Sequence, residues 1–165
     1  MGTTITDYTN VHERANHLGC TIPQCIAILP TNFVSAATRA DFLHLSEAAT
    51  VRSLFRGHDL SMDELLPAPE RAAYIQNNSF EWVAPTLFVS SCLMTENPAA
   101  VNVALNVLSA YIVELFKGSP NTDRKVKIDI VVEKKGDWSC KKIHYDGDPS
   151  GLNELPPIIR GLSDE

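Results

Sequence analysis

One segment limits the possible folds of this chain more than any other. The stretch KVKIDIVVEK, residues 125–134, alternates apolar and polar side chains with the two-residue period of a β-strand that has one buried face. Gly136-Asp137 follows and predicts a two-residue turn into a second strand over 138–145. Because a hairpin with one apolar face is not stable by itself, another layer of structure must cover that face.

The predicted turn also decides which residues of the hairpin face each other. Ile130 should face Ile143 on the apolar side, and Asp129 should face His144 on the polar side. A carboxylate beside an imidazole is common in acid–base catalysis, but it is also an ordinary cross-strand pair. We favour the structural pair, because no serine or cysteine is placed to complete a triad.

The segment NPAAVNVALNVLSAYIVELFKG, residues 97–118, predicts the clearest helix of the chain. Asn97 can cap the helix, Pro98 suits its first position, and Gly118 follows its end. Apolar residues occur nearly all the way round, which is typical of a buried helix. Its asparagine, serine and glutamate residues argue against a membrane span.

Three polar residues of this helix form a narrow stripe. Asn102, Asn106 and Ser109 are spaced at i, i+4 and i+7, so they share one face. This polar stripe could face a ligand cavity or a partner helix. The alternative that we favour is the edge of a core helix that grazes solvent, because no catalytic residue type joins the stripe.

These elements predict the fold class. The chain has 165 residues, of which 44% are hydrophobic and 21% charged, so it can bury a core and fold as a globular domain. We predict a single α+β domain over residues 20–165. It should contain a small, mainly antiparallel sheet with a C-terminal β-hairpin, packed on the long buried helix, with further helices on the same side. Residues 1–19 should form a polar, loosely ordered segment, and residues 57–72 the main surface loop.

Charge and cysteine content bear on the partners and the compartment. A net charge of −6 argues against a broad nucleic-acid interface. The first residues contain no basic segment followed by an apolar run, which predicts a cytoplasmic protein. The cysteines should then be free thiols, and their spacing does not suit zinc. We predict no metal, no cofactor and no membrane contact. The cysteines are Cys20, Cys25, Cys92 and Cys140.

The hairpin also carries the residue types of a metal-dependent nuclease. Asp129, Glu133 and Lys135 form a D…ExK pattern. The two acidic residues are four positions apart on one strand, which separates them by ~13 Å. Carboxylates that share a metal ion must each place an oxygen within ~2.6 Å of it. We therefore keep a metal-dependent hydrolase or nuclease on the 129–144 hairpin as an alternative only.

A second candidate metal site follows the hairpin. The segment DGDPSGLNE, residues 146–154, resembles the start of a calcium-binding loop, with Asp146, Asp148 and Ser150 at alternate positions. It departs from that pattern because Pro157 stands where the loop has its bidentate glutamate. The interpretation that we favour is a turn rich in Asp, Gly and Pro that starts a short helix.

The C-terminal part of the chain has a recognisable order of elements. A buried helix (NPAAVNVALNVLSAYIVELFKG) precedes a lysine-rich hairpin (KVKIDIVVEKK) and the segment YDGDPSGLNELPPIIRGL. Over residues 97–162 this order resembles the small non-catalytic accessory components of bacterial antiviral conflict (anti-phage defence) systems, which are encoded beside effectors and NTPases. The resemblance rests on pattern and transfers no functional residue. It implies a bacterial cytosolic adaptor, sensor or regulatory subunit that works by contact.

We therefore predict a non-enzymatic interaction, sensing or regulatory subunit rather than an enzyme. Its partner should be another protein, such as an effector or NTPase, in a homo-oligomer or hetero-complex. The alternatives are the hydrolase or nuclease described above and a small-molecule-binding domain that uses the polar stripe. The predicted interaction surface comprises Lys134, Lys135, Lys141, Lys142, Asp129 and His144.

Overall fold

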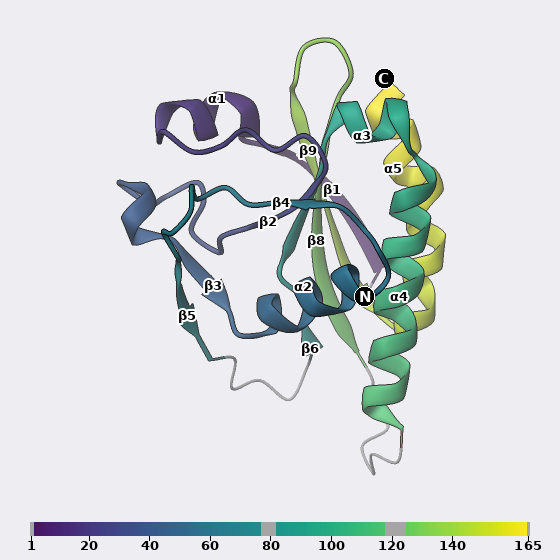
Figure 1. The fold of residues 1–165 in the computed structure, drawn as a ribbon. Coiled ribbons are helices and arrows are strands. Elements are labelled where there is room, and N and C mark those ends of the chain that lie inside the picture. Colours follow the sequence, from purple (N-terminus) through teal and green to yellow (C-terminus); the bar gives the residue numbers. More distant parts are fainter. Residues whose placement is uncertain (1, 77–81, 118–124, 165) are drawn as a thin grey trace.

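The computed structural model describes residues 2–76, 82–117 and 125–164 of the chain, which form a single α+β domain (Figure 1). The strands are β1 (Gly2–Tyr8), β2 (Ile26–Leu29), β3 (Leu43–Leu45), β4 (Met62–Asp63), β5 (Ala73–Ile75), β6 (Trp82–Val83), β7 (Thr86–Val89), β8 (Val126–Glu133) and β9 (Cys140–Gly147). The α-helices are α1 (Val11–His17), α2 (Glu47–Gly57), α3 (Ser91–Glu96), α4 (Ala99–Phe116) and α5 (Leu155–Asp164). Two short 3-10 helices are η1 (Arg39–Asp41) and η2 (Pro149–Glu154).

The predicted hairpin lies at the centre of the main sheet. The strand order is β1-β9-β8-β7-β2-β4, with β6 also paired to β8. β8 and β9 are antiparallel in the predicted register, with Ile130 opposite Ile143 and Asp129 opposite His144. The sequence pattern of residues 125–145 therefore predicted both the strands and their alignment, and this prediction is confirmed.

The hairpin loop is longer than the two-residue turn that the sequence predicted. It spans residues 134–139, between the last residue of β8 and the first of β9. The backbone N–H of Lys135 donates to the carbonyl of Ser163 in α5 at 3.0 Å. The Trp138 ring stacks on His12 of α1, with ring centroids 3.8 Å apart. The longer loop thus contacts two distant helices, and the register of the strands is the predicted one.

The main sheet is mainly antiparallel, as predicted, because β1 with β9, β8 with β9 and β2 with β7 form its longest pairs. It also contains parallel pairs, so the sheet is mixed. β6 and β7 both run parallel to β8, and β2 runs parallel to β4. Parallel neighbours need a long connection, and α3 and α4 lie in the connection between β7 and β8. Pro85 falls between β6 and β7, where it interrupts the strand because proline cannot donate to a ladder.

Helices cover the sheet on both faces. α4 and α5 lie together along one face, and α1 lies on the opposite side (Figure 1). The larger core, which α2, α4 and α5 cover, includes Phe55, Leu108, Ile130 and Ile159. The sequence predicted all the helices on one side, and α1 is the exception. It covers a smaller second core that comprises Val11, Ala27, Leu29, Phe33, Ala36, Phe42, Leu65, Phe88, Val131 and Cys140.

The strand alternation predicted that Glu133 lies on the exposed face of the hairpin, and this prediction is wrong. Its side chain is buried, and the residue is only 5% exposed. Oε1 of Glu133 accepts hydrogen bonds from the backbone N–H and the hydroxyl of Ser91, both at 2.9 Å. Ser91 is the first residue of α3, where backbone N–H groups have no partner inside the helix. Glu133 is therefore buried because it satisfies the start of α3.

The N-terminal segment is more ordered than the sequence predicted. β1 pairs antiparallel with β9 along its whole length, from Gly2 opposite Asp146 to Tyr8 opposite Cys140. The side chains of β1 are exposed on both faces, so the strand lacks the apolar alternation that reveals a half-buried strand. Backbone pairing with β9 creates this edge strand. Asn10 then caps α1 by accepting from the N–H of Glu13 at 3.0 Å.

α4 is not buried all round. It is long and apolar enough to cross a membrane, with a mean hydropathy of 1.7. In this structure one side packs on the larger core, so α4 serves as a core helix. Its other side exposes Val103, Val113 and Leu115, because α4 lies outside the sheet with no second layer beyond it among the described residues.

The C-terminal segment forms the predicted turn and helix. Asp148 caps η2 by accepting from the N–H of Ser150 at 2.9 Å, and α5 follows directly. Gly151 of η2 lies against the Tyr145 ring, whose hydroxyl donates to the carbonyl of Asp148 at 2.6 Å. A Cβ atom at Gly151 would come within 2.7 Å of Tyr145 Cζ, so the position has no room for a side chain.

We expect Gly151→Ala to lower the free energy of unfolding by about 1–3 kcal/mol, because the added methyl group must displace the Tyr145 ring. Gly161→Ala is the matched control. It lies in α5 with open space around the added Cβ, and alanine there should stabilise the helix by up to ~1 kcal/mol. Urea unfolding of both variants measures the two effects, and equal stabilities would contradict this account of η2.

Candidate functional site: an arginine-lined cavity

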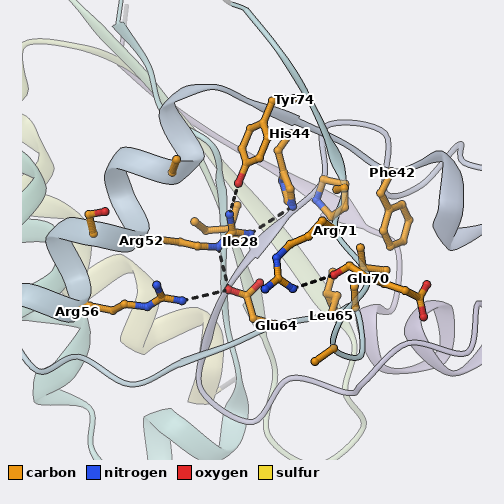
Figure 2. A pocket seen from close by; sticks show the side chains of 16 residues that line it. Ile28, Phe42, His44, Arg52, Arg56, Glu64, Leu65, Glu70, Arg71 and Tyr74 are labelled. Carbon is orange, nitrogen blue, oxygen red and sulfur yellow. Dashed lines mark hydrogen bonds and ion pairs between the residues drawn. The ribbon is translucent and has the colours of Figure 1, made fainter.

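A cavity of about 510 Å³ lies between α2, the small sheet of β3 and β5, and the segment 64–72 (Figure 2). Part of its wall is apolar and includes Ile28, Phe42 and Leu65. The polar part of its wall includes His44, Arg52, Arg56, Glu64, Arg71 and Tyr74. We refer to this space as the arginine cavity.

Local structure explains why these side chains meet. In α2, Val51 and Phe55 are buried in the larger core. Arg52 and Arg56, one residue further on in each case, therefore project from the adjacent side of the helix. β3 and β5 are parallel, and their register places His44 opposite Tyr74. Neighbours across two strands point to the same face, so both rings reach the cavity.

Arg52 is the most connected of the polar side chains. Its side chain is only 14% exposed. Nε lies 2.9 Å from Oε1 of Glu64, Nη1 donates to the Tyr74 hydroxyl at 2.8 Å, and Nη2 lies 3.4 Å from Nε2 of His44. Figure 2 shows these three contacts as dashed lines around one guanidinium group. A guanidinium group only donates, so its position and orientation are determined by these acceptors.

His44 lies in this cluster as a neutral ring. It is 7% exposed, and its burial together with the positive charge of Arg52 lowers its pKa to about 4. Because Arg52 can only donate, Nε2 is the acceptor and the proton belongs on Nδ1. Nδ1 is buried and has no hydrogen-bond partner in the part of the chain that the structure describes.

The arginine cavity has an excess of positive charge in an acidic protein. Arg52, Arg56 and Arg71 line it together with Glu64 and Glu70. The charge of Glu70 is already matched, because Arg39, which does not line the cavity, binds both of its carboxylate oxygens at 3.0 Å. Glu64 is the counter-charge of Arg52 and Arg56, whereas Arg71 donates to the backbone carbonyl of Glu70 at 3.0 Å. The lining therefore carries three guanidinium groups and, besides the paired Glu70, one carboxylate. Such a site can bind the oxyanion of a ligand.

The hairpin residues that the sequence singled out do not converge on one site. Nδ1 of His144 lies 2.6 Å from Oδ1 of Asp129, as the predicted cross-strand pair requires. Lys135 forms an ion pair with Asp164 of α5 at 2.9 Å. Because Glu133 is bound to α3, the three residues of the D…ExK pattern have separate partners. No group of three metal-ligating side chains occurs among the described residues.

The lysines of the predicted interaction surface are also dispersed. Lys141 pairs with Asp7 of β1, which leaves its charge partly neutralised. Lys142 lies on the other face of β9, the face that carries His144. Lys134 is half-buried in the hairpin loop. The four lysines therefore do not form one continuous basic patch.

The polar stripe of α4 does not line the arginine cavity. Ser109 is buried, and its hydroxyl donates to the carbonyl of Pro149 in η2 at 3.1 Å. Asn102 is half-buried, and its Oδ1 has no hydrogen-bond partner among the described residues. Asn106 is exposed. The stripe thus packs partly against η2 and partly borders solvent.

Sequence reasoning did not identify the arginine cavity. Its residues come from segments that no motif connects, and part of them lie in the predicted loop 57–72. One signal was available. Arg52 and Arg56 are four residues apart on a helix, where like charges repel unless an anion lies near both. Glu64 supplies that anion in the structure.

No family model, curated protein or solved structure matches this chain. The resemblance to accessory components of antiviral defence systems therefore stays a prediction from the sequence, as do the bacterial source and the cytoplasmic location.

We expect the protein to lose stability through His44 as the pH falls from 6.5 to 4. In this range the unfolded chain takes up a proton on His44 that the folded protein does not accept, so the folded state is penalised by up to about 3 kcal/mol. Above pH 6.5 the imidazole is neutral in both states and this contribution is constant. His44→Gln removes the titration and should show a smaller loss of stability over the same range. Urea unfolding at several pH values measures the difference, and equal slopes for the two proteins would contradict the neutral, buried imidazole.

Proposed function

We propose that this protein is a non-enzymatic sensing module that binds a small acidic molecule in the arginine cavity. The observation that carries this proposal is the Arg52 guanidinium, which is largely buried and held by three partners at the wall of the cavity. A buried guanidinium needs a matched set of acceptors, and a ligand oxyanion is the natural additional one.

The size of the cavity supports a small-molecule ligand. Its volume of about 510 Å³ lies within the ~300–1,000 Å³ that is usual for ligand sites. The polar groups come from α2, β3, β5 and the segment 64–72, and Phe42, Leu65 and Leu66 supply apolar surface. Such a lining suits a molecule with a carboxylate or phosphate head and an apolar body.

The charged groups of the cavity are better suited to binding than to proton transfer. Guanidinium groups stay protonated at any physiological pH, so Arg52, Arg56 and Arg71 offer hydrogen bonds and charge only. His44 could exchange a proton, but its pKa near 4 and its buried Nδ1 keep it from acting as an acid near neutral pH. These properties support a sensor rather than an enzyme.

A sensing module must pass its signal to something else, and we propose that this is a partner protein. The surface that we favour is the open half of the sheet, where Thr4, Lys142, His144 and Asp129 lie on one face of β1, β9 and β8. Its charged groups have both signs and are half-exposed, and the rim of a protein interface is polar and accessible to solvent.

An NMR titration tests the ligand site. Hexanoate, which has a carboxylate head and an apolar tail, and inorganic phosphate are the two probes. We expect at least one of them to shift the side-chain Nε–H signal of Arg52. Arg71→Met should weaken that binding by about tenfold, because it removes a charged hydrogen-bond donor.

Arg160→Met is the matched control, since Arg160 is an exposed residue of α5 that does not line the cavity. It should bind the probes as the unchanged protein does. If neither probe shifts signals around the cavity, the proposal is wrong. If both variants weaken binding equally, the effect reflects the net charge of the protein and not the cavity, which also contradicts it.

A further inference from the structure

We propose that Glu64 is an internal substitute for the ligand, and that binding of the ligand's oxyanion displaces the Glu64 carboxylate from Arg52. This inference rests on the proposed function, because it concerns the regulation of the same site. It predicts a sensor in which the Glu64 carboxylate occupies the oxyanion site when no ligand is bound.

The contacts of Glu64 are those that a bound carboxylate would make. Its Oε1 lies 2.9 Å from Nε of Arg52 and 3.9 Å from Nη2 of Arg56. Figure 2 shows the carboxylate between the two guanidinium groups at the wall of the cavity. One carboxylate oxygen thus occupies the position from which both arginines of α2 can be reached.

The two partners of this ion pair differ in their access to water. The Glu64 side chain is 48% exposed, whereas that of Arg52 is 14% exposed. A carboxylate that leaves the pair can therefore be hydrated at once, but the guanidinium cannot. The exchange with the lowest cost in free energy therefore replaces the Glu64 carboxylate by the ligand's oxyanion and keeps Arg52 in position.

The backbone around Glu64 is held on both sides, so displacement needs only a rotation of the side chain. Oδ2 of Asp63 accepts hydrogen bonds from the N–H groups of Gln24 and Cys25. The carbonyl of Leu65 accepts from the N–H of Thr21 at 2.9 Å, and the Leu65 side chain is buried in the second core. The exchange thus does not require the segment 64–72 to open.

Arg52 remains in place when Glu64 leaves. The Tyr74 hydroxyl and Nε2 of His44 still accept from its two terminal nitrogens. These acceptors come from the small sheet of β3 and β5, which does not include Glu64. The binding group is therefore preorganised, and a ligand need not spend its own interactions on ordering it.

Competition from Glu64 sets a threshold for the ligand. Every oxyanion must break an existing ion pair before it can bind, so the apparent affinity is lowered by the fraction of molecules in which Glu64 occupies the site. A weak, abundant anion would be excluded, and a ligand with an additional apolar body would not.

Glu64→Gln tests this inference, because it keeps the size of the side chain and removes its charge. We expect the Kd of the probe that binds the unchanged protein, hexanoate or phosphate, to fall by about fivefold, as the loss of a competing half-exposed ion pair predicts. Glu47→Gln is the matched control, because it removes the same charge from α2 at a residue that does not line the cavity. It should leave the Kd unchanged, and thermal unfolding of both variants verifies that they are folded.

The outcomes separate this inference from the proposed function. If the unchanged protein binds a probe and Glu64→Gln binds it with equal or lower affinity, Glu64 is not a competitor and only this inference is overturned. If Glu47→Gln tightens binding as much as Glu64→Gln, net charge explains the effect and the inference is again overturned. If no probe binds to either protein, the proposed function fails and the inference fails with it.

Discussion

The structure depends on β8 being hydrogen-bonded along both edges, with one face covered along its whole length and the other face covered around Val131. β9 pairs with one edge in antiparallel orientation, and β6 and β7 pair with the other in parallel orientation. The apolar residues of the strand pack under α4 and α5 on one face, and Val131 packs under α1 on the other. The backbone groups of a buried central strand must all find partners in the protein. The other elements are therefore arranged around β8: the edge strand β1, the crossover through α3 and α4, and the C-terminal segment.

A second centre organises the side of the molecule away from the hairpin. The Arg52 guanidinium connects α2 to β3, β5 and the segment after β4 through three acceptors. A guanidinium group that is largely buried would be destabilising without such acceptors, so the contacts that hold this region together also define the proposed binding site. In the proposed sensor, structural support and ligand recognition depend on the same side chain.

The sequence predicted well where local pattern decides the structure. The alternation of residues 125–134 and the position of Gly136-Asp137 together predicted the register that places Asp129 against His144. A shift of one residue would have turned the apolar face to water. The pattern failed for Glu133. This residue has a polar position of the alternation, as Asp129 has, but its side chain binds the start of α3. The pattern also failed for β1, whose edge position depends only on backbone pairing with β9. Of the candidate site, only the four-residue spacing of Arg52 and Arg56 was visible in advance.

The sequence by itself determined the α+β class, the hairpin and its register, and the existence of the long apolar helix, because these follow from periodicity and turn chemistry within short segments. Only the tertiary structure decided that the sheet is mixed, that α1 covers its second face, and that His44, Arg52, Glu64 and Tyr74 meet around one cavity. The physical reason is that such contacts depend on the packing of segments far apart in the chain. The energy of an ion pair or a buried ring is set by neighbours that no local pattern specifies.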